Sequence, residues 1–166
     1  MNLAENNYFV PEELIGLLKK RDWSHFRFQN GEAITYLYAN ELSQDIEISI
    51  EAPGGTIPEE TADQMINVLE HLDECLQKAY VWLSRLDLKH DRWFPFPDVF
   101  PNEIEKIFII YYMEFGPNIR SKKREPDRNR FSITFGTPQH AYFPLTYIVY
   151  YHHDDLSPFD ILAEPQ

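Results

Sequence analysis

The chain has a single cysteine and no long run of apolar residues, and these two absences argue against whole classes of protein. Cys75 has no partner cysteine in the chain, so we expect neither an internal disulfide nor an oxidising compartment. No apolar segment approaches the roughly 18 residues of a membrane-spanning helix. The stretch from Met1 to Tyr8 is too polar for a signal peptide. We therefore expect a cytoplasmic protein that does not enter a membrane.

Several catalytic and metal-binding motifs are also missing. Pro53-Gly54-Gly55 lacks the lysine or third glycine of a phosphate-binding loop, and no Gly-x-Ser-x-Gly or His-Glu-x-x-His segment is present. Neighbouring ligands in His152-His153-Asp154-Asp155 would point to opposite faces of a strand. His71 and Cys75 lie four apart on a predicted helix but lack the further nitrogen or sulfur ligands of a zinc site, so Cys75 is expected to be buried and inert. We predict no catalytic residues, no metal and no cofactor.

Basic residues are scarce relative to acidic ones. The chain has 15 Lys and Arg against 27 Asp and Glu, which gives a formal net charge of −12 and a pI of about 4.8. Such a charge repels nucleic acid and anionic membranes and attracts basic proteins, although solubility alone would also account for it. The basic residues concentrate between Arg120 and Arg130. This segment is predicted to be a solvated hairpin loop or, as the alternative, a loop that contacts an acidic partner or a phosphate.

Apolar and aromatic residues are abundant, and their spacing predicts the fold. At 166 residues, 43% hydrophobic and 15% aromatic, residues 1–166 are expected to form a single α+β domain. Thr56 to Leu86 has the spacing of one long helix of about 45 Å, with Thr56 and Glu59 as a capping box. Its apolar face, which we call the helix seam, consists of Ala62, Met65, Leu69, Leu72, Leu76, Ala79, Leu83 and Leu86.

Predicted strands lie on both sides of the long helix. A short helix begins at Pro11, and Asn30-Gly31 is typical of a tight hairpin between two strands. Asp45 to Glu51 alternates between isoleucines and polar residues, which predicts a strand with an acidic face in water. Because strands cluster instead of alternating with helices, we expect an antiparallel sheet of about six strands with the long helix packed across it. The six predicted strands are 23–28, 33–38, 45–51, 106–113, 131–135 and 145–151, and the tail from Leu156 is expected to lie on the surface.

The stretch Ile46 to Leu86 combines an alternating strand, a Pro-Gly break and a Leu-rich helix. In this pattern, and in its acidic, aromatic-rich build, the chain resembles the immunity proteins encoded beside bacterial polymorphic and contact-dependent toxins. The resemblance implies a stoichiometric binder that blocks a toxin, often a basic nuclease, through a complementary acidic surface.

We therefore predict a non-enzymatic binding module for a basic protein. The expected partner-binding residues are Asp45, Glu47 and Glu51 on the alternating strand, followed by Asp154 and Asp155. One alternative is an enzyme or small-ligand binder with an aromatic pocket at Trp93 to Pro101. The other is a structural protein that self-associates through the helix seam or an apolar strand. The sequence does not predict the oligomeric state.

Overall fold

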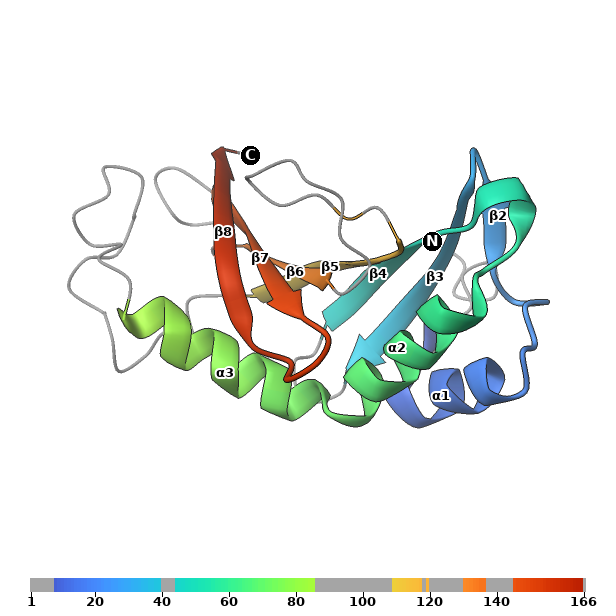
Figure 1. Cartoon of the computed structure of the whole chain (residues 1–166), viewed down its shortest axis with the longest axis horizontal. Coiled ribbons are helices and arrows are strands. Elements are labelled where there is room, and N and C mark those ends of the chain that lie inside the picture. The colour runs from blue at the N-terminus through green and yellow to red at the C-terminus, as the bar shows by residue number, and fades with distance from the viewer. Residues whose placement is uncertain are drawn as a thin grey trace.

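The computed structural model describes residues 8–39, 44–85, 109–117, 119, 130–136 and 145–165, and these form an α+β fold (Figure 1). The helices are α1 (Pro11–Lys19), α2 (Glu59–Glu70) and α3 (Leu72–Arg85), with a 3-10 turn at Pro53–Gly55. The strands are β1 (Tyr8–Phe9), β2 (Arg27–Gln29), β3 (Glu32–Ala39), β4 (Gln44–Glu51), β5 (Ile109–Phe115), β6 (Arg130–Gly136), β7 (Leu145–His152) and β8 (Pro158–Pro165).

One sheet contains all of these strands. Seven follow one another in the order β1-β3-β4-β5-β6-β7-β8, and β2 pairs with β3 beside β1. The pairs are antiparallel except β1 with β3 and β4 with β5, which are parallel. The prediction of about six strands was too low, because β1 and β8 were not recognised. Prolines at both ends of β8 obscured it in the sequence, but a terminal strand of a sheet tolerates them.

Local sequence signals account for the first half of the sheet. Asn30 and Gly31 have φ angles of 51° and 76°, as a two-residue hairpin turn between β2 and β3 requires, so the predicted hairpin is confirmed. The isoleucines at 46, 48 and 50 are all fully buried in the core, which confirms the alternation of β4. The acidic side of β4 is less exposed than expected, since Ser49 is buried and Glu47 and Glu51 are half-buried between β3 and β5.

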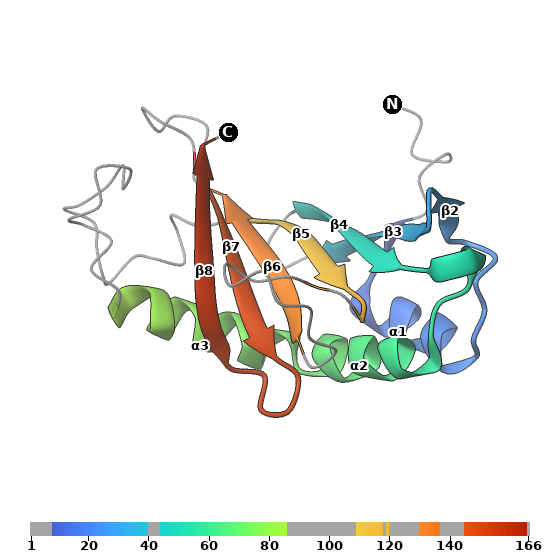
Figure 2. The same ribbon diagram turned by 45° about the horizontal axis from the view of Figure 1, so that its top comes forward.

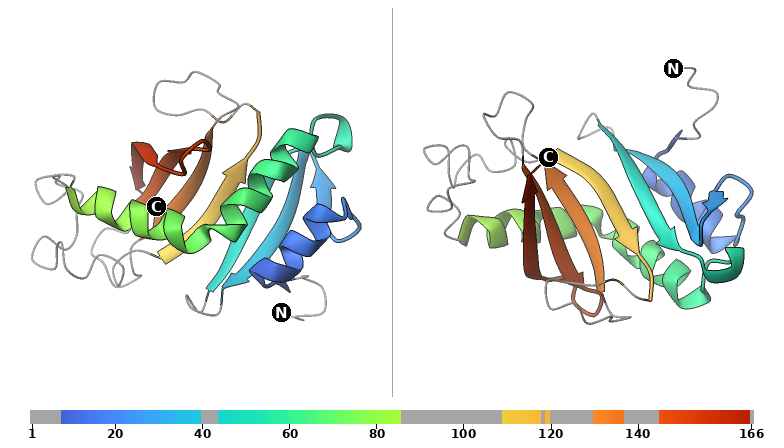
Figure 3. Two further views of the ribbon diagram at one scale, coloured as in Figure 1. Left: turned by 60° about the horizontal axis from the view of Figure 1, so that its bottom comes forward. Right: turned by 90° about the horizontal axis from the view of Figure 1, so that it is seen from above.

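The helices pack on one face of the sheet (Figures 2 and 3). The helix seam from Ala62 to Leu83 is buried and belongs to the same core cluster as the β4 isoleucines. Leu86 lies outside the described residues. The other face of the sheet carries the alternate side chains of β3 to β7, and the candidate site lies there.

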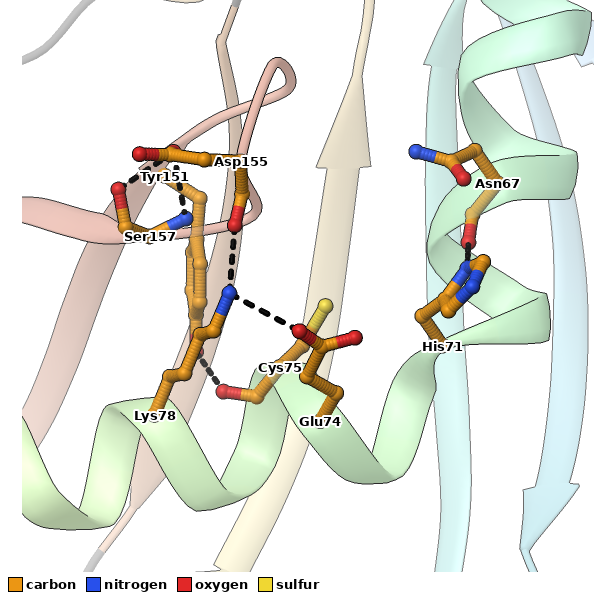
Figure 4. Close-up of polar contacts among 8 residues, drawn as sticks. All are labelled: Asn67, His71, Glu74, Cys75, Lys78, Tyr151, Asp155 and Ser157. Atoms are coloured by element: carbon orange, nitrogen blue, oxygen red, sulfur yellow. Dashed lines mark hydrogen bonds and ion pairs between the residues drawn. The ribbon is translucent and has the colours of Figure 1, made fainter.

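The predicted single long helix is wrong, because the helix is interrupted at His71. This residue has φ −120° and ψ 28°, outside the helical region, and its backbone N–H is donated to the carbonyls of Asn67 and Val68. Its ring Nδ1 lies 2.8 Å from the Asn67 carbonyl oxygen (Figure 4). The interruption lets α2 and α3 run in different directions beneath the twisted sheet (Figure 3).

The predicted capping box at Thr56 is also wrong. The N-cap residue of α2 is Pro58, in an extended conformation, and no side chain caps the helix. Thr56 is extended as well, with φ −128° and ψ 132°. Pro58 disfavours a helical conformation in Ile57, the residue before it, so the helix cannot begin as early as Thr56.

Aromatic side chains join the strands to α3. The Phe131 ring stacks on Phe115 and on Tyr151, with centroid distances of 5.7 and 4.7 Å. The buried Tyr151 hydroxyl donates a hydrogen bond of 3.1 Å to the Cys75 carbonyl oxygen (Figure 4). Burial raises the pKa of the Tyr151 hydroxyl well above its usual value, so this group remains a proton donor.

We expect the Cys75 thiol to be unreactive in the folded protein. Burial, and secondarily the charge of Glu74, raises the pKa of this thiol to about 12, so almost none of it is thiolate at neutral pH. A chromogenic disulfide reagent should therefore titrate no thiol in the native protein and one thiol per chain in concentrated guanidinium chloride. Rapid labelling of the native protein would contradict the buried position of Cys75.

Candidate protein-binding surface

Four glutamates lie on the sheet face that points away from the helices. Glu32 belongs to β3, Glu47 and Glu51 to β4, and Glu114 to β5. Their positions alternate with core residues such as Ile48 and Met113, so the pleat directs all four to the same face. We call these four residues the glutamate cluster.

Strand register brings like charges together in the cluster. Glu32 is the direct cross-strand neighbour of Glu51, and Glu114 lies opposite Ser49, two residues before Glu51. Like charges directly opposite each other in a sheet destabilise it. Within the described part of the chain, neither Glu32 nor Glu114 forms an ion pair. Ion pairs in that part of the chain include Lys19 with Glu70, Arg21 with Glu59 and Asp63, and Lys78 with Glu74.

Glu114 has the most perturbed environment of the four. Burial raises the pKa of its carboxyl group above the usual value of 4.5, and the charges of Glu51 and Glu32 raise it further. The neighbouring Tyr112 hydroxyl also has a raised pKa, mainly through burial, although a hydrogen bond with the Ser49 side chain opposes this shift. A partly buried, charge-repelled carboxyl group is a recognised mark of a functional surface.

A glycine allows Glu51 to approach β5. Gly116, directly after β5, has φ 153°, and a Cβ atom there would lie 2.6 Å from Cβ and Cγ of Glu51. The Glu51 side chain therefore lies against the backbone of Gly116. Any larger residue at 116 would push Glu51 away from the position it takes beside Glu114.

Replacing Glu114 by glutamine should stabilise the fold at neutral pH. A carboxyl group whose folded-state pKa is raised destabilises the fold when it is ionised at a pH above both pKa values. The gain in the free energy of unfolding should shrink as the pH falls through the folded-state pKa, and it should vanish below the usual value of 4.5. Urea unfolding of both proteins across this pH range measures the difference.

Glu12→Gln is the matched control for that experiment. It removes one glutamate charge from the exposed first turn of α1 and changes the net charge equally. We expect no stabilisation from it, because an acid near a helix N-terminus is favourable. Equal stabilisation by both variants would attribute the effect to net charge and not to the glutamate cluster.

The predicted site residues do not all come together. Asp45 is exposed at the start of β4, on the same face as Glu47 and Glu51 and opposite Tyr38 of β3. Glu47 lies opposite Tyr36, whose hydroxyl donates to it at 3.3 Å. These three acids on β4 share one surface, as predicted, and the other predicted pair lies elsewhere.

Asp154 and Asp155 belong to the turn between β7 and β8, next to the helices (Figure 1). The Asp155 carboxylate accepts hydrogen bonds from the backbone and hydroxyl of Ser157, and these bonds lower its pKa. Its backbone carbonyl accepts a hydrogen bond of 2.6 Å from Lys78 Nζ on α3 (Figure 4). The Asp155 carboxylate therefore stabilises the turn, and its carbonyl bonds the turn to α3. This confirms the turn expected in this segment.

Asp154 lines a groove of about 500 Å³ between this turn and α2. The other lining residues are Glu60, Asp63, Gln64, Asn67 and His153. Asp63 also binds Arg21 at 2.7 Å, so part of this acidity is already neutralised. The groove lies on the helix side and is a separate place from the glutamate cluster. In the described ranges, no group of His, Cys, Asp and Glu side chains is arranged to hold a metal ion.

Other predicted features fall largely outside the described residues. The segment Trp93 to Pro101 is among them, as is most of the basic segment that ends at Arg130. Arg130 itself opens β6 and is buried, with its guanidinium 5.4 Å from the centroid of the Phe159 ring. The expectation that this arginine is solvated in a loop was wrong, because the strand extends to include it.

Sequence reasoning missed Glu32 and Glu114 as site residues. Glu32 follows the Asn30-Gly31 turn, and Glu114 is the one charged residue of the apolar strand β5. An isolated acid in such a strand is a usable signal. Its neighbours, however, depend on the parallel pairing of β4 with β5, which no local pattern reveals.

Comparison with protein-family models, curated proteins and solved structures finds no match for this chain. None of the described helices is both long and apolar enough to cross a bilayer. The function is therefore inferred from the glutamate cluster.

Proposed function

We propose that this protein is a non-enzymatic binding module of the immunity type, which neutralises a basic protein such as a toxin domain by binding it directly. The observation that carries the proposal is the register of the glutamate cluster. Like charges lie side by side on three neighbouring strands, at a cost to the stability of the sheet. Cationic side chains of a partner would remove that repulsion on binding.

Electrostatics supports the same choice of partner. The net charge of −12 attracts a basic protein from a distance, and close carboxylates such as Glu32 and Glu47 can then pair with individual cations. Association should be fast and should slow as salt is added, because charges at the rim of an interface act mainly on the association rate. The self-association alternative finds less support, since the helix seam from Ala62 to Leu83 is buried within the chain.

Charge reversal in the glutamate cluster tests the proposal. The first candidate partner to test by co-purification is the product of the adjacent gene. Glu47→Lys with Glu51→Lys should weaken its binding by about 100-fold or more, as the loss of close charge pairs does in other complexes. The matched control is Glu12→Lys with Glu13→Lys on the exposed first turn of α1. Each pair changes the net charge from −12 to −12 + 4 = −8, so only the position differs.

Binding constants from calorimetry at low and at physiological salt decide the result. The proposal requires that the control keep most of the affinity and that the cluster variant lose it. Absence of a complex with the adjacent gene product at low salt would count against the immunity role, and equal losses in both variants would show that no specific surface is involved.

A further inference from the structure

Building on the proposed function, we infer that two neighbouring tyrosine–acid pairs on β3 and β4 receive two cationic side chains from an extended segment of the partner. The pairs are Tyr38 with Asp45 and Tyr36 with Glu47, and we call them the tyrosine–acid ladder. The inference rests on accessible aromatic rings as well as on charge. It specifies how the cations are spaced in the partner.

Strand register places the four side chains of the ladder in one patch. Tyr38 is the direct cross-strand neighbour of Asp45, and Tyr36 is that of Glu47. Their positions alternate with fully buried core residues such as Leu37, so the pleat directs all four away from the helices (Figure 3). Directly opposite residues of an antiparallel pair have Cβ atoms about 5 Å apart, so each ring lies beside a carboxylate.

The ladder is accessible to a partner. Tyr38 is 36% exposed and Asp45 is exposed as well, and within the described part of the chain neither side chain forms a hydrogen bond or an ion pair. Tyr36 and Glu47 are half-buried, and the Tyr36 hydroxyl donates to the Glu47 carboxylate at 3.3 Å. Because a carboxylate has about four acceptor sites, Glu47 can still bind a cation.

A tyrosine ring beside a carboxylate attracts a cationic side chain in two ways. The negative face of the ring attracts a cation within about 6 Å of its centre, and the carboxylate forms a charged hydrogen bond with the same group. Tyrosine is also enriched among the residues that contribute most to binding at protein interfaces. The charges of Asp45 and Glu47, in a chain of net charge −12, favour a cation over a neutral or anionic group.

The spacing of the two pairs indicates the form of the partner segment. Tyr36 and Tyr38 are two residues apart on β3, so the pairs are about 7 Å apart along the strand. Alternate residues of an extended chain have the same spacing and point to the same side. A segment with cations at alternate positions therefore places one on each pair, whereas adjacent cations point to opposite sides.

The test uses the full chain and two peptides of the same composition, acetyl-Gly-Arg-Gly-Arg-Gly-amide and acetyl-Gly-Arg-Arg-Gly-Gly-amide. In an NMR titration, the alternating peptide should shift the amide signals of Tyr36, Tyr38 and Asp45 saturably. The adjacent peptide should bind about 5-fold more weakly, because in an extended conformation it reaches only one pair.

Tyr38→Leu separates the contribution of the ring from that of charge. It keeps the net charge and an apolar side chain but removes the aromatic face, so it should weaken binding of the alternating peptide by about 3-fold or more. Phe28→Leu is the matched control. Phe28 is comparably exposed, at 38%, but it pairs with the core residue Ala33 and so lies on the other face of the sheet. We expect no change in peptide binding from it.

Equal binding of the two peptides, or an unchanged affinity in Tyr38→Leu, would overturn the inference. So would shifts confined to residues outside the ladder. These failures are distinct from failure of the proposed function, because the peptides require no protein partner. A partner that is lost in the Glu47 and Glu51 variant but bound normally by Tyr38→Leu would support the binding role and reject the tyrosine–acid ladder.

Discussion

Leu76→Asp should lower the free energy of unfolding by more than half in a domain of ordinary stability. Leu76 lies in the middle of the helix seam on α3 and is 6% exposed, within the single core cluster. An aspartate there loses the leucine contacts and buries a carboxylate without a counter-charge, at a cost of about 3–5 kcal/mol. Because domains of this size are stable by only about 5–15 kcal/mol, that loss removes much of the margin.

Gln77→Asp is the control for this substitution. Gln77 is the next residue of α3 and is exposed, so the same side chain is introduced into water. Circular dichroism with urea unfolding should show a large loss of stability for Leu76→Asp and a small one for Gln77→Asp. Similar curves for the two variants would mean that the seam does not pack against the sheet.

Phe131→Ala should lower the free energy of unfolding by a comparable amount, about 3–5 kcal/mol, because it leaves a cavity in the second half of the sheet. The ring is fully buried and lies nearly parallel to those of Phe115 and Tyr151, at interplanar angles of 11° and 13°. It also contacts the buried His153 ring at a centroid distance of 4.7 Å. Three strands and the turn after β7 therefore lose contacts at once.

Phe28→Ala provides the comparison for that loss. Phe28 lies in the hairpin strand β2 and is 38% exposed, so its truncation should cost far less. Chemical unfolding at equilibrium, analysed with a common slope, gives both differences in free energy. If Phe131→Ala were no more damaging than Phe28→Ala, the aromatic stack would not be a major contributor to stability.

Local patterns in the sequence were sufficient to predict several helices, strands and turns. Pro11 begins α1, Asn30-Gly31 forms a hairpin, and the alternation of Asp45 to Glu51 marks a strand. Each of these depends on residues within about one turn or one strand. Their conformations are therefore set by the chemistry of adjacent side chains.

Features that depend on distant contacts were not predictable in the same way. The interruption at His71 has no proline or glycine to mark it, and the apolar spacing from Leu69 to Leu72 continues through it. Only two of the four residues of the glutamate cluster were predicted, for a related reason. Glu47 and Glu51 follow from the alternation of β4, whereas Glu114 reaches them only through strand pairing across the sheet.

The parallel pairing of β4 with β5 also has a consequence for the speed of folding. It joins Glu47 to Tyr112, a separation of 112 − 47 = 65 residues, whereas the hairpin of β3 and β4 closes between Ala39 and Gln44, 44 − 39 = 5 residues apart. Chain-closure entropy makes the longer contact about 2 kcal/mol harder to form. We expect the strands β1 to β4 and the strands β5 to β8 to pair among themselves first. The pairing of β4 with β5 should then form late, as the slow step of folding. The glutamate cluster spans the junction, so a chain that has not passed that step lacks the binding surface.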